Sequence, residues 1–212
     1  MRDFPVFTTE DGVGSLIFKE IPYQGAAFVK IHDVSSLEGF LAECISFSKV
    51  AGAERIYASG NADLSAYPVH TSVFRMRVSR EDLPDTDACL MPLTQEHLED
   101  FRQLYNRRMR DVPNHAFMTQ KDAEEMLSEK EGYFVHRNGE LLGIGIAGAN
   151  TIKAVVSCIP GSGRDVVLAL NYALNGEFAE LDVASENKRA IRLYDRLGFI
   201  KVREISKWHK IY

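Results

Sequence analysis

The hydrophobic pattern of the first half of the chain predicts four strands and one helix. The strands are expected where apolar residues alternate with polar ones or form short runs, at residues 15–19, 25–31, 55–58 and 72–78. A helix is expected from Ser35 or Ser36, either of which can cap it, to about Ala51. Apolar residues recur along it at helical spacing: Leu37, Phe40, Leu41, Cys44 and Ile45. This half of the sequence contains no catalytic constellation.

From residue 88 onwards, patterns of the same kinds predict a complete α/β domain. Strands or strand pairs are expected at residues 89–93, 132–148, 151–159 and 177–183, and a last strand opens at Phe199. Asn138-Gly139 predicts a two-residue hairpin turn. Helices are expected to begin after Thr94, Thr119, Gly163 and Ser185. The predicted fold class is therefore α/β (α+β), with a mixed central sheet flanked by helices.

A polar and acidic segment, Ser79 to Asp87, separates the two halves. It reads SREDLPDTD, with Pro84 inside it, which is typical of a connection between domains. We therefore expect two domains, residues 1–84 and 88–212.

Residues 185–199, SENKRAIRLYDRLGF, carry the most specific pattern of the chain. They follow a predicted strand, and Ser185 is expected to cap a helix that ends at Gly198. The stretch resembles the GNAT superfamily of acetyl-CoA-dependent N-acetyltransferases, whose last core strand and helix carry an Asn, an Ala-hydrophobic pair, a Tyr and then Leu-Gly-Phe at this spacing. The matching residues are Asn187, Ala190, Ile191, Tyr194, Leu197, Gly198 and Phe199.

The resemblance implies the GNAT acyl-CoA N-acyltransferase fold for residues 88–212. In the family, the Asn touches the coenzyme and the Tyr hydroxyl lies near its sulfur, which implies these roles for Asn187 and Tyr194. The alternative is that Tyr194 is only a core residue of an amphipathic helix, with its hydroxyl at the surface.

The order of elements in the first half echoes that of the second. A helix, IYASGN and a strand ending in VFRMRV correspond in order to a helix, LDVASEN and FIKVREI. Some GNAT-like proteins are tandem, with a degraded N-terminal copy that keeps the sheet but not the coenzyme site. The first half is either such a GNAT-like remnant or an unrelated small α+β scaffold domain.

A glycine-rich segment, PGSGRD, precedes the helix predicted after residue 163. Such a segment exposes backbone N–H groups at the positive end of a helix dipole, which can hold a pyrophosphate. The GNAT motif here is Gln or Arg, two residues, Gly, one residue, and Gly or Ala. The resemblance therefore implies that coenzyme A contacts this segment, at Gly161, Ser162, Gly163 and Arg164.

Two residues depart from that motif. Pro160 replaces Gln or Arg and removes a donor, and Asp165 replaces the small final residue with a carboxylate that repels phosphate. Arg164 can compensate by pairing with the phosphate or with Asp165. A lone glycine-rich turn is often no more than a loop.

The resemblance implies transfer of an acetyl group from acetyl-CoA to a primary amine by direct attack in a ternary complex. In the family, the strand before the pyrophosphate loop offers backbone groups to the pantetheine and the acetyl carbonyl. By position these groups belong to Val155, Val156 and Ser157. Tyr194 would then protonate the leaving thiolate.

The sequence does not identify the general base or the acceptor. Glu180, Asp182 and His136 are candidates for a base acting through water, and each is better explained as a solvated or structural charge. The amine belongs to a small molecule or a peptide. The alternative function is a non-catalytic member of the fold, one that binds coenzyme A or a partner protein.

Composition and charge argue against several classes of binding partner. The net charge of −5 is mild and there is no basic block, which argues against nucleic acid. No apolar run approaches the roughly 18 residues of a membrane span, so a cytoplasmic protein is expected. The three cysteines form no CxxC pair and the histidines no HxxxH motif, so no metal is expected. The protein is expected to be a monomer or a homodimer.

The end of the chain leaves a predicted sheet edge to be covered. After FIKVREI only SKWHKIY remains, whereas many family members close with a longer hairpin. We expect the N-terminal half or a second subunit to cover this edge, because an open edge invites unwanted pairing.

Overall fold

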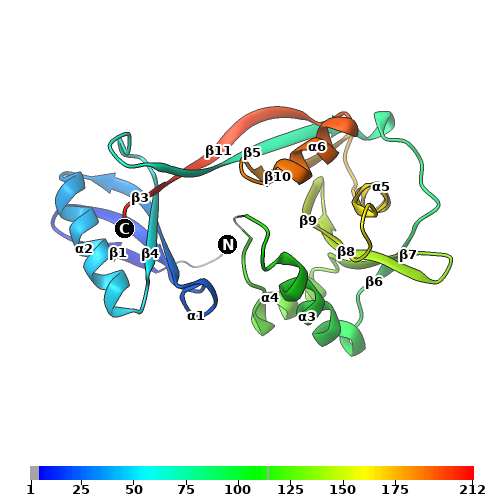
Figure 1. Cartoon of the computed structure of the whole chain (residues 1–212), viewed down its shortest axis with the longest axis horizontal. Coiled ribbons are helices and arrows are strands. Elements are labelled where there is room, and N and C mark those ends of the chain that lie inside the picture. Colours follow the sequence, from blue (N-terminus) through cyan, green and yellow to red (C-terminus); the bar gives the residue numbers. More distant parts are fainter. Residues whose placement is uncertain (1–4, 114) are drawn as a thin grey trace. The chain divides into compact units, whose positions relative to one another are not determined.

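The computed structural model describes residues 5–113 and 115–212, and the chain has a mixed α+β fold (Figure 1). It divides into two compact units. The first comprises the residues up to Val73 together with Glu204–Tyr212, and the second comprises Phe74–Arg203. Both divisions fall inside long strands, β5 (Val69–Ser79) and β11 (Ile200–Lys210).

These packing units differ from the predicted division of the chain at residues 84–88. The end of β11 belongs to the first unit, and the last residues of β5 belong to the second. A compact unit is defined by contacts, whereas the predicted domains follow the order of the sequence. The two-domain organisation therefore stays a prediction.

In the described part of the first unit, helix α2 (Leu37–Val50) packs on one face of the sheet. Its strands are β1 (Val6–Thr8), β2 (Gly12–Ile17), β3 (Ala26–Val34), β4 (Arg55–Gly60) and the end of β11, in that order across the sheet. The short helix α1 (Ile21–Gln24) joins β2 to β3. Ser36 caps α2 by accepting a hydrogen bond from the Gly39 N–H. Phe40 and Leu41 of α2 are fully buried in the core of this unit.

The second unit contains the rest of the helices and strands. Its elements are β6 (Cys89–Pro92), α3 (Leu98–Met109), α4 (Gln120–Ser128), β7 (Gly132–Arg137), β8 (Glu140–Gly148), β9 (Thr151–Ser157), α5 (Gly163–Asn171), β10 (Phe178–Ala184) and α6 (Lys188–Arg196). The strand order is β11-β5-β10-β9-β8-β7-β6. The predicted hairpin turns at Asn138-Gly139, where both residues have positive φ, as a type I′ turn requires.

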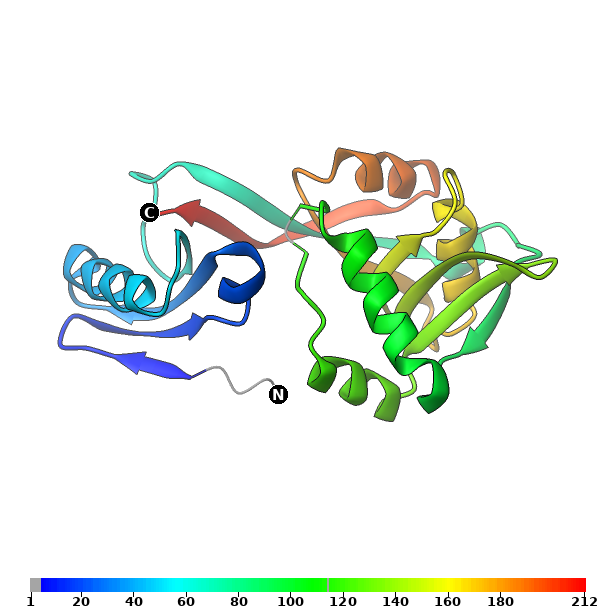
Figure 2. The same ribbon diagram turned by 60° about the horizontal axis from the view of Figure 1, so that its bottom comes forward.

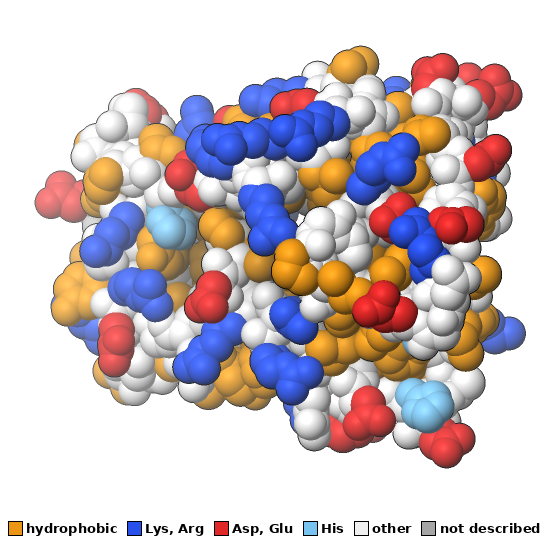
Figure 3. Space-filling view, turned by 45° about the vertical axis from the view of Figure 1, so that its right-hand side comes forward, with side chains coloured by type: hydrophobic (Ala, Val, Ile, Leu, Met, Phe, Trp, Pro, Cys, Tyr) orange, Lys and Arg blue, Asp and Glu red, His pale blue; other side chains and the backbone are white. Residues whose placement is uncertain are grey.

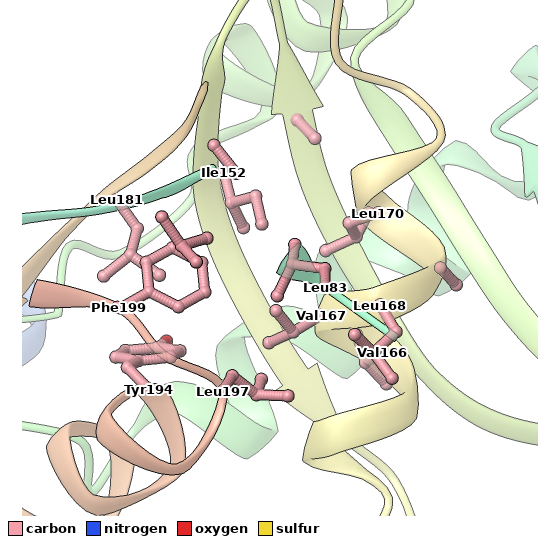
Figure 4. Packing of buried hydrophobic residues seen from close by; sticks show 14 of the residues in the cluster. Leu83, Ile152, Val166, Val167, Leu168, Leu170, Leu181, Tyr194, Leu197 and Phe199 are labelled. Atoms are coloured by element: carbon pink, nitrogen blue, oxygen red, sulfur yellow. The ribbon is translucent and has the colours of Figure 1, made fainter. Parts of the chain in front are cut away.

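Helices cover both faces of the sheet in the second unit (Figure 2). Helices α5 and α6 pack on one face, over an apolar core that includes Ile152, Leu181 and Phe199 (Figure 4). Gly143 and Gly145 of β8 allow α5 to approach closely, because a Cβ at either position would come within 2.7 Å of a Val166 or Leu170 side chain. Helices α3 and α4 pack on the opposite face, over a second apolar cluster.

A strand from the first half of the sequence, β5, also takes part in the sheet of the second unit. β5 lies between β10 and β11, and its Arg75 guanidinium binds both oxygens of Asp182 at 2.9 and 3.0 Å. Arg77, also from β5, donates to Glu180 at 2.7 Å. As expected from the short C-terminal segment, the N-terminal half supplies the strand that lies beside β11.

Candidate functional site

Strands β9 and β10 part from each other after a short parallel contact. β9 pairs with β8 from Thr151 to Ser157, except at Lys153. It pairs with β10 only at Thr151–Glu180 and Ile152–Leu181, and within the described chain no pairing between them continues further. The backbone groups of residues 153–157 on that side therefore have no strand partner from β10. An extended ligand can use such groups as a strand would.

A β-bulge explains where the two strands part. Ile146 pairs with Ala154 and Ala147 pairs with Ile152, so that Lys153 is an extra residue in β9. A bulge bends its strand and increases the local twist. The Lys153 ammonium is held by the Glu131 carboxylate. The bulge follows the last β9–β10 pair directly, so it turns the end of β9 away from β10.

The predicted pantetheine contacts Val155, Val156 and Ser157 lie on this diverging part of β9. The Val156 side chain is buried in the cluster beneath α3, and Val155 packs against the core beneath α5 and α6. Both valine side chains are thus used in packing. This leaves the backbone groups of Val155 and Val156 for a ligand, and contact through backbone groups is what the resemblance implies for them.

The first turn of α5 lies beside the end of β9. A Cβ placed on Gly163 would be 3.0 Å from the Ser157 hydroxyl oxygen and 3.2 Å from the Leu193 side chain of α6. Gly161 has φ +90°, and a Cβ there would meet nothing within 4 Å. The structure therefore brings Ser157, Gly163 and α6 together, and it leaves open space next to Gly161.

Ser162 is turned inward. It is buried, and its hydroxyl donates to the Leu142 and Ile159 carbonyl oxygens at 2.7 and 2.9 Å. As the N-cap residue of α5 it makes no side-chain cap hydrogen bond. Because the first N–H groups of a helix have no partner within it, those of Gly163 and Arg164 are available to an anion. The serine hydroxyl itself is occupied by the two carbonyls.

The carboxylate of Asp165 is paired with a residue that sequence reasoning did not single out. Arg137, the last residue of β7, places Nη2 2.8 Å from Asp165 Oδ1 and Nε 2.7 Å from Asp87 Oδ1. Asp165 raises the pKa of Arg137 through this hydrogen bond, and Asp87 adds to the effect. Arg164 is exposed, and it is Arg137 that pairs with Asp165.

Tyr194 lies in the core of the second unit. Its side chain packs against Phe199 with ring centroids 5.7 Å apart, next to Leu197 (Figure 4). The residue is only 8% exposed, and burial raises the pKa of its phenol to about 12. The ring is thus packed in the core, as the alternative interpretation has it. The catalytic role stays a prediction.

Asn187, and not Ser185, caps helix α6. The Asn187 Oδ1 accepts the Ala190 N–H at 3.1 Å, so the expected cap at Ser185 is wrong. The Ser185 hydroxyl instead donates to the neighbouring Glu186. The turn after β10 is two residues longer than the sequence pattern suggested. A contact from Asn187 to the coenzyme would use its amide nitrogen, because the oxygen serves the helix.

The candidate bases have structural surroundings. Glu180 and Asp182 both bind the arginines of β5, as described above. The buried Nδ1 of His136 has no hydrogen-bond partner among the described residues. The ion pairs therefore agree with the interpretation of Glu180 and Asp182 as structural charges.

Basic side chains gather near α6, which exposes Lys188, Arg189, Arg192 and Arg196. Figure 3 shows Lys and Arg side chains in a row in the upper part of its view. In a chain of net charge −5, such a local excess favours an anionic ligand.

Among the described residues, no group of three or more His, Cys, Asp or Glu side chains is placed to hold a metal ion. In that same part of the chain, every helix is too short or too polar to cross a membrane.

The comparisons with known proteins identify the fold. No family model matches the chain, and a search of curated proteins found no relative. The structure is similar to a GCN5-related N-acetyltransferase from Kribbella flavida, with 14% identity, a TM-score of 0.57 and coverage of 99% of this chain and 90% of that one. It is also similar to a protein of unknown function from Staphylococcus epidermidis, with 12% identity, a TM-score of 0.61 and coverage of 98% and 93%.

A third similar structure is a tandem GNAT protein from the clavulanic acid biosynthesis pathway. It shares 11% identity, with a TM-score of 0.51 and coverage of 94% of this chain and 79% of that one. At such identities the likeness concerns the fold alone. The chain thus has the GNAT fold, as its C-terminal sequence pattern predicts.

Proposed function

We propose that this protein is an acetyl-CoA-dependent N-acetyltransferase that acts on a primary amine of a small molecule or peptide. The observation that carries the proposal is the parting of β9 from β10 after Ile152 and Leu181, beside the uncapped first turn of α5. An opening between strands accepts an extended chain through backbone groups, and a helix N-terminus accepts phosphate. Coenzyme A has both parts, an extended pantetheine arm and a pyrophosphate.

The residues present fit such a ligand. The N–H groups of Gly163 and Arg164 would hold the pyrophosphate, and the open space at Gly161 leaves room for it. The backbone of residues 153–157 would hold the pantetheine arm. The acetyl carbonyl oxygen would accept a hydrogen bond from a β9 N–H group, which stabilises developing negative charge.

Acetyl-CoA supplies a thioester, whose C–S bond breaks as the new C–N bond forms. The amine loses a proton and the thiolate gains one. With a pKa of about 12, the Tyr194 phenol is a weaker acid than a thiol of pKa about 8.5. Tyr194 would therefore act by donating a hydrogen bond to the leaving sulfur. The proton that the thiolate gains would come from solvent or from the acceptor amine.

The acceptor would approach from the sheet face opposite α5 and α6. Glu180 and Asp182 lie on that face, because residues alternate along β10 and Leu181 faces α6.

A non-catalytic coenzyme-binding protein is the second candidate, and the burial of Tyr194 favours it. The variant Tyr194→Phe separates the two. In an enzyme it should lower turnover about 100-fold while leaving coenzyme affinity unchanged. Turnover equal to that of the wild type would remove the assigned role.

Calorimetric titration of acetyl-CoA into the purified protein tests the site. We expect micromolar binding that is lost in Gly163→Arg, because the added side chain would collide with Ser157 and Leu193 at the first turn of α5. Gln95→Arg adds the same charge at an exposed position and is the matched control, expected to bind as the wild type does. Binding that survives in Gly163→Arg, or absence of binding to the wild type, would contradict the proposal.

A further inference from the structure

We infer that Arg137 is a positioning residue for the coenzyme, because it neutralises Asp165, which would otherwise present a negative charge to the pyrophosphate at the first turn of α5. The inference rests on the proposed coenzyme site. It concerns a residue on β7, far from the glycine-rich segment in sequence.

Geometry makes Arg137 a fixed partner. It lies directly before the Asn138-Gly139 turn, whose two residues have φ values of +52° and +80°. Its guanidinium then bridges Asp165 at 2.8 Å and Asp87 at 2.7 Å.

Asp165 is the more important of the two carboxylates. Its side chain is 19% exposed, compared with 73% for Asp87, so its charge is less screened by water. It is also the third residue of α5, within the turn whose N–H groups would bind the pyrophosphate. A carboxylate there favours the helix itself but competes with a bound anion for the same dipole.

The pair also explains a departure from the GNAT pattern. The motif ends in a small residue, where this chain has Asp165. The aspartate extends to the β7–β8 hairpin and is bound there by Arg137. The two residues together add no net charge beside the phosphate site, so coenzyme binding is compatible with the substitution.

Coenzyme A binding to a set of variants tests the inference by calorimetry. In Arg137→Gln, the carboxylate is left unpaired, and we expect the Kd to rise about tenfold, equivalent to about 1.4 kcal/mol. In Arg137→Gln/Asp165→Asn both charges are gone, and affinity should return to within about threefold of the wild type. Arg137→Lys should retain most of the affinity, because the charge persists.

Salt separates this electrostatic role from a purely structural one. The tenfold effect of Arg137→Gln should shrink in high salt, because screening weakens repulsion between the carboxylate and the phosphates. Thermal unfolding of each variant shows whether it is folded. If Arg137→Gln does not fold, the coenzyme A affinity of Asp165→Asn alone tests the inference. This variant is expected to bind coenzyme A at least as tightly as the wild type.

Three results would overturn the inference: an unchanged Kd in Arg137→Gln, a double variant as weak as Arg137→Gln, or weaker binding by Asp165→Asn. In each of these three cases the wild type still binds coenzyme A, so the proposed function would stand. Absence of binding to the wild type would instead reject the coenzyme site, and this inference with it.

Discussion

The chemistry of Tyr194 depends on its burial. Its ring is part of the apolar core with Leu197 and Phe199, and this burial raises the pKa of the phenol. Burial disfavours the charged phenolate, so the hydroxyl stays protonated at any physiological pH. This suits a hydrogen-bond donor better than an acid that gives up its proton.

An alkaline titration of the tyrosines, followed by phenolate absorbance, tests this burial. We expect Tyr194 to ionise late, near pH 12, and this late step to be absent in Tyr194→Phe. The folded-state pKa lies above the unfolded value of about 10. The corresponding stabilisation is therefore complete below about pH 10 and is lost as the pH rises towards 12.

Tyr172→Phe, at an exposed tyrosine, is the matched control for that titration and should keep the late step. If the alkaline end of the Tyr194→Phe curve coincides with that of the wild type, Tyr194 is not buried in solution.

At the scale of elements, two local features set the geometry of the site. The bulge at Lys153 directs the end of β9 away from β10, and the Asn187 cap sets where α6 begins. Leu193 of α6 then lies against Gly163 of α5. Each feature involves few residues, and each determines where a longer element points.

The cap of α6 gives a stability prediction. Asn187→Ala should lower the free energy of unfolding by about 1 kcal/mol, because the Ala190 N–H loses its partner. Ser185→Ala is the matched control and should change it by less than about 0.5 kcal/mol. Urea denaturation measures both. An equal loss in the two variants would show that Asn187 is not the cap in solution.

Some features of these elements can be predicted from the sequence, and others cannot. The hairpin at Asn138-Gly139 and the strand–helix order around α5 and α6 follow from local signals, and the structure has them. The Lys153 bulge and the Arg137–Asp165 pair do not, because each depends on which distant residues become neighbours. The sequence predicts Ser185 as the cap of α6 because it is the first residue after the strand that can cap a helix. The tertiary position of the turn favours Asn187 instead.

At the scale of the whole molecule, neither half of the sequence forms its sheet alone. β5 comes from the first half and lies between β10 and β11, and the last residues of β11 pair with β4. A chain that began at residue 88 would lack the strand whose Arg75 and Arg77 bind Glu180 and Asp182. The first half therefore has a structural role in the second unit, whether it is a degraded GNAT copy or a scaffold.

Hydrogen exchange with and without coenzyme A tests the central claim most directly, because it shows where on the chain the ligand binds. We expect protection at residues 153–157 and over the first turn of α5, with no change in β2 and β3 of the first unit. Protection confined to the first unit, or no protection at residues 153–165 at saturating coenzyme, would contradict a coenzyme site between β9 and β10.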